Sequence, residues 1–469
     1  MIKKLWLRRL LAFPAVFLLV FTIAVFHYVH KFFKDVNLEQ ILFFINTPTK
    51  GVDGHLLRLF IEHCILTPSL YALLICYLPE IRFLRFKSSL CKISYIAFIS
   101  LLSLLLTVSY IFYKTDYSTL HRFFSTERTD FYENHYADPK LADIQILHKK
   151  NLIVLHIESL EKTFENKSFF GKNLLADLHD FETDNTQFSN FQNGYATDFT
   201  QGSVIALFTG MPLKYHYLVN KFGRNLHFFY GYYSLSKILK DNGYALAAVQ
   251  GTDRDFGGMG KFLSDNDLTD LTDLQVIKQK YPQYKQNGSW GYTDDYVFAI
   301  AKDKVIQLSQ NQPYFLYVQT IDSHVGYKPE VPQLAEYDNQ YYNIIHYTQK
   351  HLANFLRWMR QRSDYNDTVI VIVGDHLCMG DDFPMPTERS IYNLFINVDK
   401  PQNTNRTFTQ VDLFPTIIEA MGGIIENHRL GIGTSVFSAE KTFSEIYSEE
   451  FLHKTLAKRN KLYEKMFMQ

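Results

Sequence analysis

The chain has 469 residues, which exceeds one ordinary domain, and 47% of them are hydrophobic. Its formal net charge is +0, because 48 basic side chains balance 48 acidic ones. This balance excludes the class of nucleic-acid binders that depend on a strongly positive surface, so we expect no nucleic-acid partner.

The N-terminal third contains three apolar stretches long enough to span a bilayer, at residues 10–30, 57–78 and 93–113. Basic residues precede the first stretch, and no small-residue cleavage site follows it, so we predict a retained anchor. More basic residues separate the second and third stretches, and the positive-inside rule places both basic segments in the cytoplasm. Three crossings then leave the rest of the chain on the outer face.

The second apolar stretch is the weakest of the three, because it contains Glu62 and His63. The alternative for this stretch is a buried or interfacial helix. Because all three stretches are long enough to span a bilayer, we assign residues 1–114 to a membrane domain with about three transmembrane helices. Residues 115–145 are polar, aromatic and irregular, and are typical of a linker or a surface wrap.

Two apolar strands in the rest of the chain end in residues that can bind a metal or transfer a proton. Residues 151–157 lead to Glu158, and residues 368–373 lead through Gly374 to Asp375 and His376. Runs of this kind are typical of strands buried on both faces of a parallel sheet, whose carboxyl ends form the functional edge. The side chains at these ends are candidate metal ligands or an acid/base pair. The alternative is a pair of strand-end turns with solvated polar residues.

Further strands and helices alternate along this part of the chain. We expect strands at 244–250 and 313–320, and helices at 232–242, 294–309 and 341–362. This order predicts an α/β domain over residues 146–440, with a mostly parallel central sheet flanked by helices. Residues 441–469 form a helical tail, whose basic amphipathic end either touches a membrane surface or packs on the domain.

Three polar residues, Thr197, Asp198 and Thr200, precede an apolar helical pattern. One interpretation is a simple N-cap. The other is a hydroxyl nucleophile at a helix N-terminus, where the helix dipole favours a phosphate group. A divalent ion held by Glu158, Asp375 and His376 would activate the Thr200 hydroxyl, and the ligand set suits Mn²⁺, Mg²⁺ or Zn²⁺.

Two further residues are candidates for contact with a phosphate. His324 follows the strand at 313–320, where it could bind a phosphoryl oxygen or protonate a leaving group. Arg389 follows the strand that leads to Asp375, and the alternative there is an ordinary surface arginine.

Six sequence blocks between residues 151 and 438 carry a resemblance to a known family. The blocks are IES at Glu158, FTQGSVIALFTGMP at Thr200, VQGTDRDFGG at Asp253, TIDSHVGY at His324, DTVIVIVGDHLCM at Asp375, and TQVDLFPTIIEAMG followed by RLGIGTS. Their order and spacing resemble the membrane-anchored phospho-headgroup transferases of the alkaline-phosphatase/sulfatase superfamily. That group includes lipoteichoic acid synthase, the lipid A phosphoethanolamine transferases and the phosphoglycerol transferases of periplasmic glucans.

The resemblance implies roles for particular residues. Its metal-binding positions match Glu158, Thr200, Asp375 and His376, with Thr200 carrying the headgroup as a covalent intermediate. The position matching His324 contacts the headgroup phosphate, and the headgroup pocket includes the positions of Asp253 and Phe256. The chain departs from lipoteichoic acid synthase here, because Gln250, Arg254 and Phe256 stand where a histidine, tryptophan and arginine pattern is expected.

The resemblance also implies the substrates of the reaction and the location of the protein in the cell. The donor is a membrane phospholipid, phosphatidylglycerol or phosphatidylethanolamine, and the acceptor is a glycan or a lipopolysaccharide sugar. The location is the bacterial inner membrane, with a multi-pass anchor and a periplasmic catalytic domain. The alternatives are a phosphodiesterase or hydrolase of the same superfamily, and a catalytically silent membrane protein that binds lipid.

Overall fold

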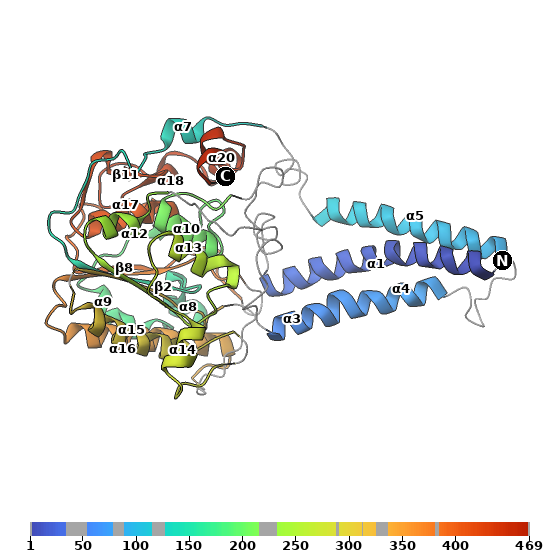
Figure 1. Ribbon diagram of the computed structural model, residues 1–469, viewed down its shortest axis with the longest axis horizontal. Helices are drawn as coiled ribbons and strands as arrows, with labels where there is room; N and C mark the ends of the chain where they lie inside the picture. The colour runs from blue at the N-terminus through green and yellow to red at the C-terminus, as the bar shows by residue number, and fades with distance from the viewer. Residues whose placement is uncertain are drawn as a thin grey trace. The chain divides into compact units, whose positions relative to one another are not determined.

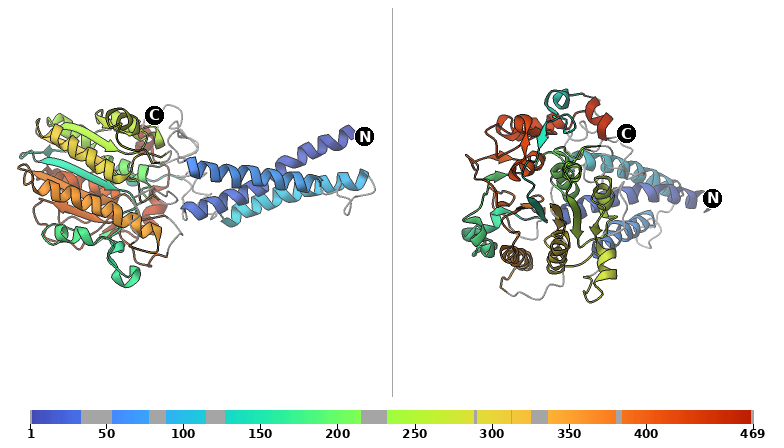
Figure 2. Two further views of the ribbon diagram at one scale, coloured as in Figure 1. Left: turned by 90° about the horizontal axis from the view of Figure 1, so that it is seen from below. Right: turned by 60° about the vertical axis from the view of Figure 1, so that its left-hand side comes forward.

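The computed structural model describes residues 2–33, 54–77, 89–114, 127–214, 232–287, 290–311, 313–324, 336–379 and 384–467. It divides into two compact units, an N-terminal helical unit and a C-terminal unit, which we describe separately. Figure 1 and Figure 2 show both as ribbons.

The N-terminal unit is built from three long helical segments. They are α1 (Ile2–Phe33), a segment formed by α3 (Gly54–Phe60), the π-helical turn Ile61–Leu66 and α4 (Thr67–Tyr77), and α5 (Ser89–Lys114). Each contains a stretch long and apolar enough to cross a membrane: Ala12–Phe32, Gly54–Tyr77 and Ser94–Ile111. The described residues of the three predicted apolar stretches are therefore helical. Glu62 in the second is paired with Arg58, whose Nε lies 2.7 Å from the carboxylate.

The C-terminal unit is organised around a six-stranded sheet with the order β5-β4-β6-β2-β7-β8. All neighbours are parallel except β7 and β8, which are antiparallel. The strands are β2 (Asn151–Ile157), β4 (Ala245–Gln250), β5 (Leu271–Thr272), β6 (Tyr314–Gln319), β7 (Thr368–Gly374) and β8 (Asn393–Ile396). The mostly parallel sheet was predicted, and the antiparallel edge strand was not.

Helices cover both faces of this sheet, and each face has its own apolar core. One face carries α10 (Thr200–Thr209), α12 (Leu235–Asp241), α13 (Met259–Asp265) and α17 (Leu413–Ala420). The other carries α14 (Leu274–Lys280), α15 (Asp294–Leu308) and α16 (Gln340–Arg360). Every residue of β2 and β7 is buried, because these central strands face helices on both sides.

Shorter elements complete the C-terminal unit. Three two-stranded ladders pair β1 (Ile144–Gln145) with β10 (Ile424–Ile425), β3 (Asn190–Phe191) with β9 (Thr407–Phe408), and β11 (Arg429–Leu430) with β12 (Gly433–Thr434). The short helices are α7 (Phe131–His135), α8 (Lys167–Phe170), α9 (His179–Glu182), α18 (Phe443–Ile446), α19 (Glu449–Leu456) and α20 (Lys461–Phe467).

The segment before β2 and the C-terminal tail both pack on the same unit. β1 pairs with β10, so residues 144–145 are part of a ladder. Leu452, Leu456 and Tyr463 of the tail are buried in the core that contains α10 and α17. Of the two alternatives for the tail, the structure therefore shows packing on the domain.

Candidate active site

The ends of β2 and β7 bring three chemically active side chains together. The two strands pair in parallel, with Ile157 opposite Gly374, so Glu158 and Asp375 follow at the same edge of the sheet. The Asp375 amide also donates to the Ile157 carbonyl at 3.1 Å. Ligand atoms of Glu158, Asp375 and His376 all lie within 4.8 Å of one another, and all three residues are buried. The strand-end cluster predicted from the sequence is therefore present.

The hydroxyl of Thr200 joins this cluster from the first residue of α10. Its Oγ1 lies 3.2 Å from Glu158 Oε2 and 3.5 Å from His376 Nε2. Thr197 points elsewhere: its hydroxyl donates to Gln410 Oε1 at 2.6 Å and accepts from the Gly194 amide. Of these two hydroxyls, the one at Thr200 contacts the cluster, and the one at Thr197 secures the loop before the helix.

The surroundings of the cluster leave specific atoms available to a cation. His376 Nδ1 lies 2.9 Å from the Leu377 carbonyl, so we assign the ring proton to Nδ1 and a lone pair to Nε2. Asp375 Oδ1 accepts amide hydrogen bonds from Ser159 and His376, at 2.7 and 2.8 Å. Asp375 Oδ2 is buried and has no hydrogen-bond partner among the described residues. A buried carboxylate oxygen without a partner is costly, and a bound cation would satisfy it.

The electrostatic environment of Glu158 also fits a bound cation. Burial and then the nearby charge of Asp375 raise the pKa of Glu158 well above its usual value. Its Oε1 accepts from the Ser159 hydroxyl at 2.8 Å, and Ser159 adopts a positive φ of 51° between the two carboxylates. Oxygen and imidazole donors without thiolate fit a divalent ion such as Mn²⁺, Mg²⁺ or Zn²⁺. The residues present therefore fit the expected metal.

His324 follows β6 next to this cluster. The hydroxyl of the preceding Ser323 donates to the backbone carbonyl of Glu158, which ties the His324 loop to the end of β2. The His324 ring packs edge-on against Trp290, with ring centroids 4.5 Å apart. Trp290 in turn packs against Phe256, with centroids 5.9 Å apart. Trp290 was not among the predicted site residues.

The loop that carries Asp253 and Phe256 packs against the helix of Thr200. A Cβ added at Gly257, where φ is +57°, would overlap the Gln201 side chain. The Asp253 carboxylate accepts from the Asp255 amide and from Gln275 Nε2, each at 2.9 Å. The structure thus brings Phe256 to the aromatic side of the site and holds Asp253 in a hydrogen-bonded turn.

Arg389 is engaged in an internal ion pair. Its guanidinium binds the buried carboxylate of Glu161, with Nε 3.1 Å from Oε2, and donates to the Cys378 carbonyl at 2.7 Å. Glu161 was not identified from the sequence. A second missed residue is Gln410, whose Nε2 donates to the Asp375 carbonyl at 3.0 Å and so braces the loop after β7.

The sulfatase family model matches residues 150–424, which is more than half of the chain. The chain belongs to the sulfatase family. The chain also resembles phosphoglycerol transferase I of Escherichia coli strain K12, with 30% identity over 323 residues. That alignment covers 66% of this chain and 41% of the relative, so the chain spans about two-fifths of the length of the curated relatives it matches.

Solved structures show the same fold. An alkaline phosphatase superfamily protein from Vibrio parahaemolyticus has a TM-score of 0.54 at 22% identity, covering 66% of this chain and 76% of that one. The lipooligosaccharide phosphoethanolamine transferase EptA from Neisseria meningitidis, an integral membrane protein, has a TM-score of 0.51 at 13% identity, covering 94% and 87%. The lipoteichoic acid synthase LtaP from Listeria monocytogenes has a TM-score of 0.50 at 17% identity, covering 64% and 79%. The predicted alkaline phosphatase/sulfatase-like α/β fold is confirmed.

Proposed function

We propose that this chain is an enzyme that transfers a phospholipid headgroup, phosphoglycerol or phosphoethanolamine, to a glycan through a covalent phosphothreonine at Thr200. The observation that carries the proposal is the Thr200 hydroxyl at 3.2 Å from Glu158, beside a buried Asp375 oxygen that has no hydrogen-bond partner in the described part of the chain. Similarity to phosphoglycerol transferase I supports phosphoglycerol as the transferred group and phosphatidylglycerol as the donor.

The first half of the proposed reaction forms the covalent intermediate. The Thr200 oxygen attacks the phosphorus of the donor, and the bond between phosphorus and the diacylglycerol oxygen breaks. The proton of the Thr200 hydroxyl passes to solvent. The diacylglycerol oxygen gains a proton, for which His324 is the candidate donor, and His324 then regains a proton from solvent. When bound by Glu158, Thr200, Asp375 and His376, a divalent ion supplies Lewis-acid chemistry that lowers the pKa of the Thr200 hydroxyl and polarises the phosphoryl group.

The second half of the reaction regenerates the enzyme. A sugar hydroxyl attacks the phosphorus, the bond to the Thr200 oxygen breaks, and the sugar's proton replaces the one that Thr200 lost. One phosphodiester bond is broken and one is formed, so no nucleotide is needed. His324, Asp253 and Phe256 contact the headgroup in this proposal, and the wall formed by Trp290 and Phe256 keeps water from the phosphothreonine.

The membrane helices have a direct use in this scheme, because the donor is itself a membrane lipid. We assign residues 1–114 to a multi-pass anchor in the bacterial inner membrane and residues 146–440 to a periplasmic catalytic domain with a tail at 441–469. Three candidate spans and the similarity in fold to an integral membrane transferase support this assignment. The predicted linker at 115–145 is shorter than expected, because Phe131 and Tyr132 are buried in the core of the C-terminal unit and residues 144–145 pair with β10; residues 115–126 lie outside the described residues.

A transfer assay with the full chain in lipid vesicles tests the proposal. The donor is phosphatidylglycerol labelled in its headgroup, with matched vesicles carrying labelled phosphatidylethanolamine, and a neutral oligosaccharide is present or absent. We expect diacylglycerol and labelled oligosaccharide, formed together and lost in Thr200→Ala. Free labelled headgroup at the same rate with and without the oligosaccharide would identify a hydrolase. No headgroup release from either lipid would contradict the proposal.

A further inference from the structure

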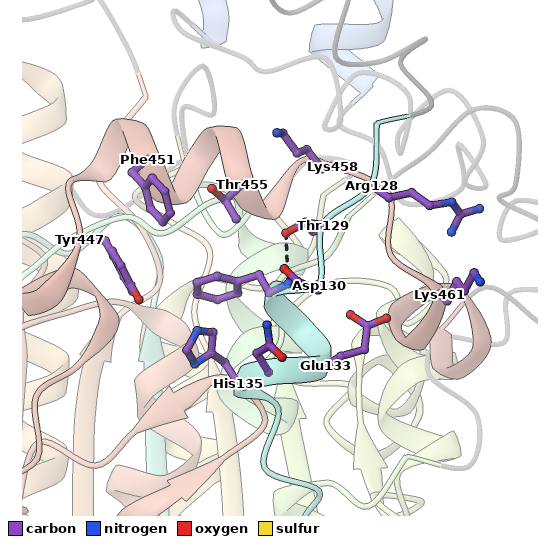
Figure 3. A pocket seen from close by; sticks show the side chains of 12 residues that line it. Arg128, Thr129, Asp130, Glu133, His135, Tyr447, Phe451, Thr455, Lys458 and Lys461 are labelled. Carbon is purple, nitrogen blue, oxygen red and sulfur yellow. Dashed lines mark hydrogen bonds between the residues drawn. The ribbon is translucent and has the colours of Figure 1, made fainter.

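A cavity in the C-terminal unit lies outside the site described above. It has a volume of about 720 Å³ and is formed by residues 128–135, which include α7, together with Tyr447, α19, α20 and the residues between these two helices. Figure 3 shows its lining, with Tyr447 and Phe451 on one side and Arg128 and Lys461 on another. A volume of several hundred Å³ is typical of sites for small organic molecules.

Aromatic side chains form one wall of this cavity. Tyr447 and Phe451 are stacked, with ring centroids 4.8 Å apart, and Phe131 packs against Tyr447 at 6.1 Å. Phe451 is 44% exposed, so part of an aromatic ring is open to a ligand. The C–H faces of sugar rings are apolar and stack on such rings, while sugar hydroxyls need both donors and acceptors nearby.

The rest of the lining supplies both acceptors and donors of hydrogen bonds. Asp130, Glu133 and Asn134 offer oxygen acceptors, and Lys461 offers a donor. The other two basic groups already face acids: Lys458 Nζ lies 3.3 Å from Glu127, and Arg128 Nη1 lies 4.0 Å from Glu464. A cavity with compensated charges does not select a strongly charged ligand, and this favours a polar, uncharged one.

The cavity is connected to the helix that carries Thr200. α10 begins at Thr200, and the chain just beyond its end is bonded to Tyr463 of α20: the Tyr463 hydroxyl donates to the Pro212 carbonyl at 2.7 Å and accepts from the Lys214 amide at 2.8 Å. Lys214 Nζ also donates to the Lys458 carbonyl, at the cavity. The ten residues of α10 span roughly 15 Å along the helix axis.

We propose that this cavity binds neutral sugar units of the glycan acceptor, at a distance from the sugar hydroxyl that reacts. The inference rests on the proposed transferase function and adds an acceptor subsite to it. The cavity is linked through Lys214 to the chain beyond the C-terminal end of α10, whereas Thr200 is the first residue of that helix, so in this proposal a chain of linked sugars, and not a monosaccharide, joins the two places. The enzyme would thereby select chains of linked sugars over free sugars.

Calorimetric titration of the detergent-solubilised full chain with neutral β-linked gluco-oligosaccharides tests this inference. All variants carry Thr200→Ala, so turnover does not contribute and failure of the transfer reaction leaves the titration unaffected. We expect saturable binding, about tenfold weaker after Phe451→Ala, because one stacked ring is lost. The matched control is Phe169→Ala, which removes a phenylalanine of similar exposure, 40%, outside the cavity and leaves binding unchanged.

A second variant and a second probe make the test independent of folding. Lys461→Ala removes an exposed donor at the rim and weakens oligosaccharide binding without touching the aromatic wall. Glycerol phosphate serves as the anionic probe for a lipid headgroup. Equal oligosaccharide affinity in all variants, no oligosaccharide binding at all, or glycerol phosphate binding that depends on Phe451 would each overturn the inference.

Discussion

The Thr200 hydroxyl lies 3.2 Å from Oε2 of Glu158, although the two residues are 42 positions apart in the chain. The contact exists because β2 ends at the sheet edge onto which the N-terminus of α10 is packed. His376, from the end of β7, lies 3.5 Å from the same hydroxyl. Three separate elements thus meet at one oxygen atom, which is the geometry a nucleophile activated by a metal requires.

Asp375→Asn is expected to remove the metal and keep the fold. The asparagine carbonyl can still accept the amide hydrogen bonds of Ser159 and His376, while an amide NH₂ group replaces Oδ2, for which the described residues provide no hydrogen-bond partner. An amide nitrogen that carries hydrogens does not bind a divalent cation. We expect metal content, measured by elemental analysis, to fall from about one ion per chain to almost none.

The control for this substitution is Asp184→Asn, at an exposed aspartate outside the site. It should leave both metal content and headgroup transfer at the level of the unmodified chain. Full metal content in Asp375→Asn would show that this carboxylate is not a ligand.

Arg389→Ala tests whether Arg389 stabilises the fold or binds phosphate. Glu161 is fully buried, so removing its partner leaves an uncompensated charge, and we expect a loss of about 3–5 kcal/mol in the free energy of unfolding. Chemical denaturation measures this loss. Adding Glu161→Gln should recover part of it, because the buried charge is then gone.

The matched control is Arg357→Ala, whose arginine is 43% exposed and lies 3.4 Å from Asp177, so the expected cost is under about 1 kcal/mol. An unchanged unfolding free energy in Arg389→Ala, together with a raised KM for the phospholipid, would instead identify Arg389 as a phosphate contact.

The buried carboxyl group of Asp294 makes the stability of the fold depend on pH, and a single substitution can remove this dependence. Its carboxylate accepts from the Ile321 amide at 3.0 Å and from the Thr348 hydroxyl at 2.6 Å, so it holds the loop that leads to His324. Burial raises its pKa from 3.8 to about 6. The folded state therefore favours the protonated acid, whose contribution to stability is complete below pH 3.8 and is lost as the pH rises through about 6.

Asp294→Asn lacks this titration, and asparagine can keep the amide contact. The melting temperature of the variant relative to the unmodified chain should rise between pH 4 and pH 6, roughly the interval between the two pKa values. Thermal denaturation in buffers across this interval measures the difference. A constant difference would show that Asp294 keeps an ordinary pKa in the folded chain.

The sequence was sufficient to predict the central sheet and the residues at its edge. β2 is apolar apart from Asn151 and His156, and β7 has five consecutive apolar residues; the two strands stop abruptly at Glu158 and at Asp375, a pattern that reflects burial on both faces. The short antiparallel β8, Asn393–Ile396, was missed, because an asparagine followed by three apolar residues does not distinguish a strand from any other buried segment.

Partners that come from distant parts of the chain were also missed. Glu161 and Arg389 are 228 residues apart, and neither shows a local pattern that indicates an ion pair. Trp290 reaches His324 from the loop before α15, and Gln410 reaches the Asp375 carbonyl from the turn before α17. Such contacts depend on how loops pack over the sheet, and the periodicity of a single sequence does not contain that information.

Mass spectrometry of the peptide that contains Thr200 tests the central claim most directly. The full chain is incubated with headgroup-labelled phosphatidylglycerol without any acceptor, quenched in acid and digested. The account predicts that labelled phosphoglycerol is attached to Thr200, and that the adduct is absent from Thr200→Ala and disappears when an acceptor glycan is added before quenching. An adduct on another residue, or headgroup transfer at the normal rate by Thr200→Ala, would contradict it.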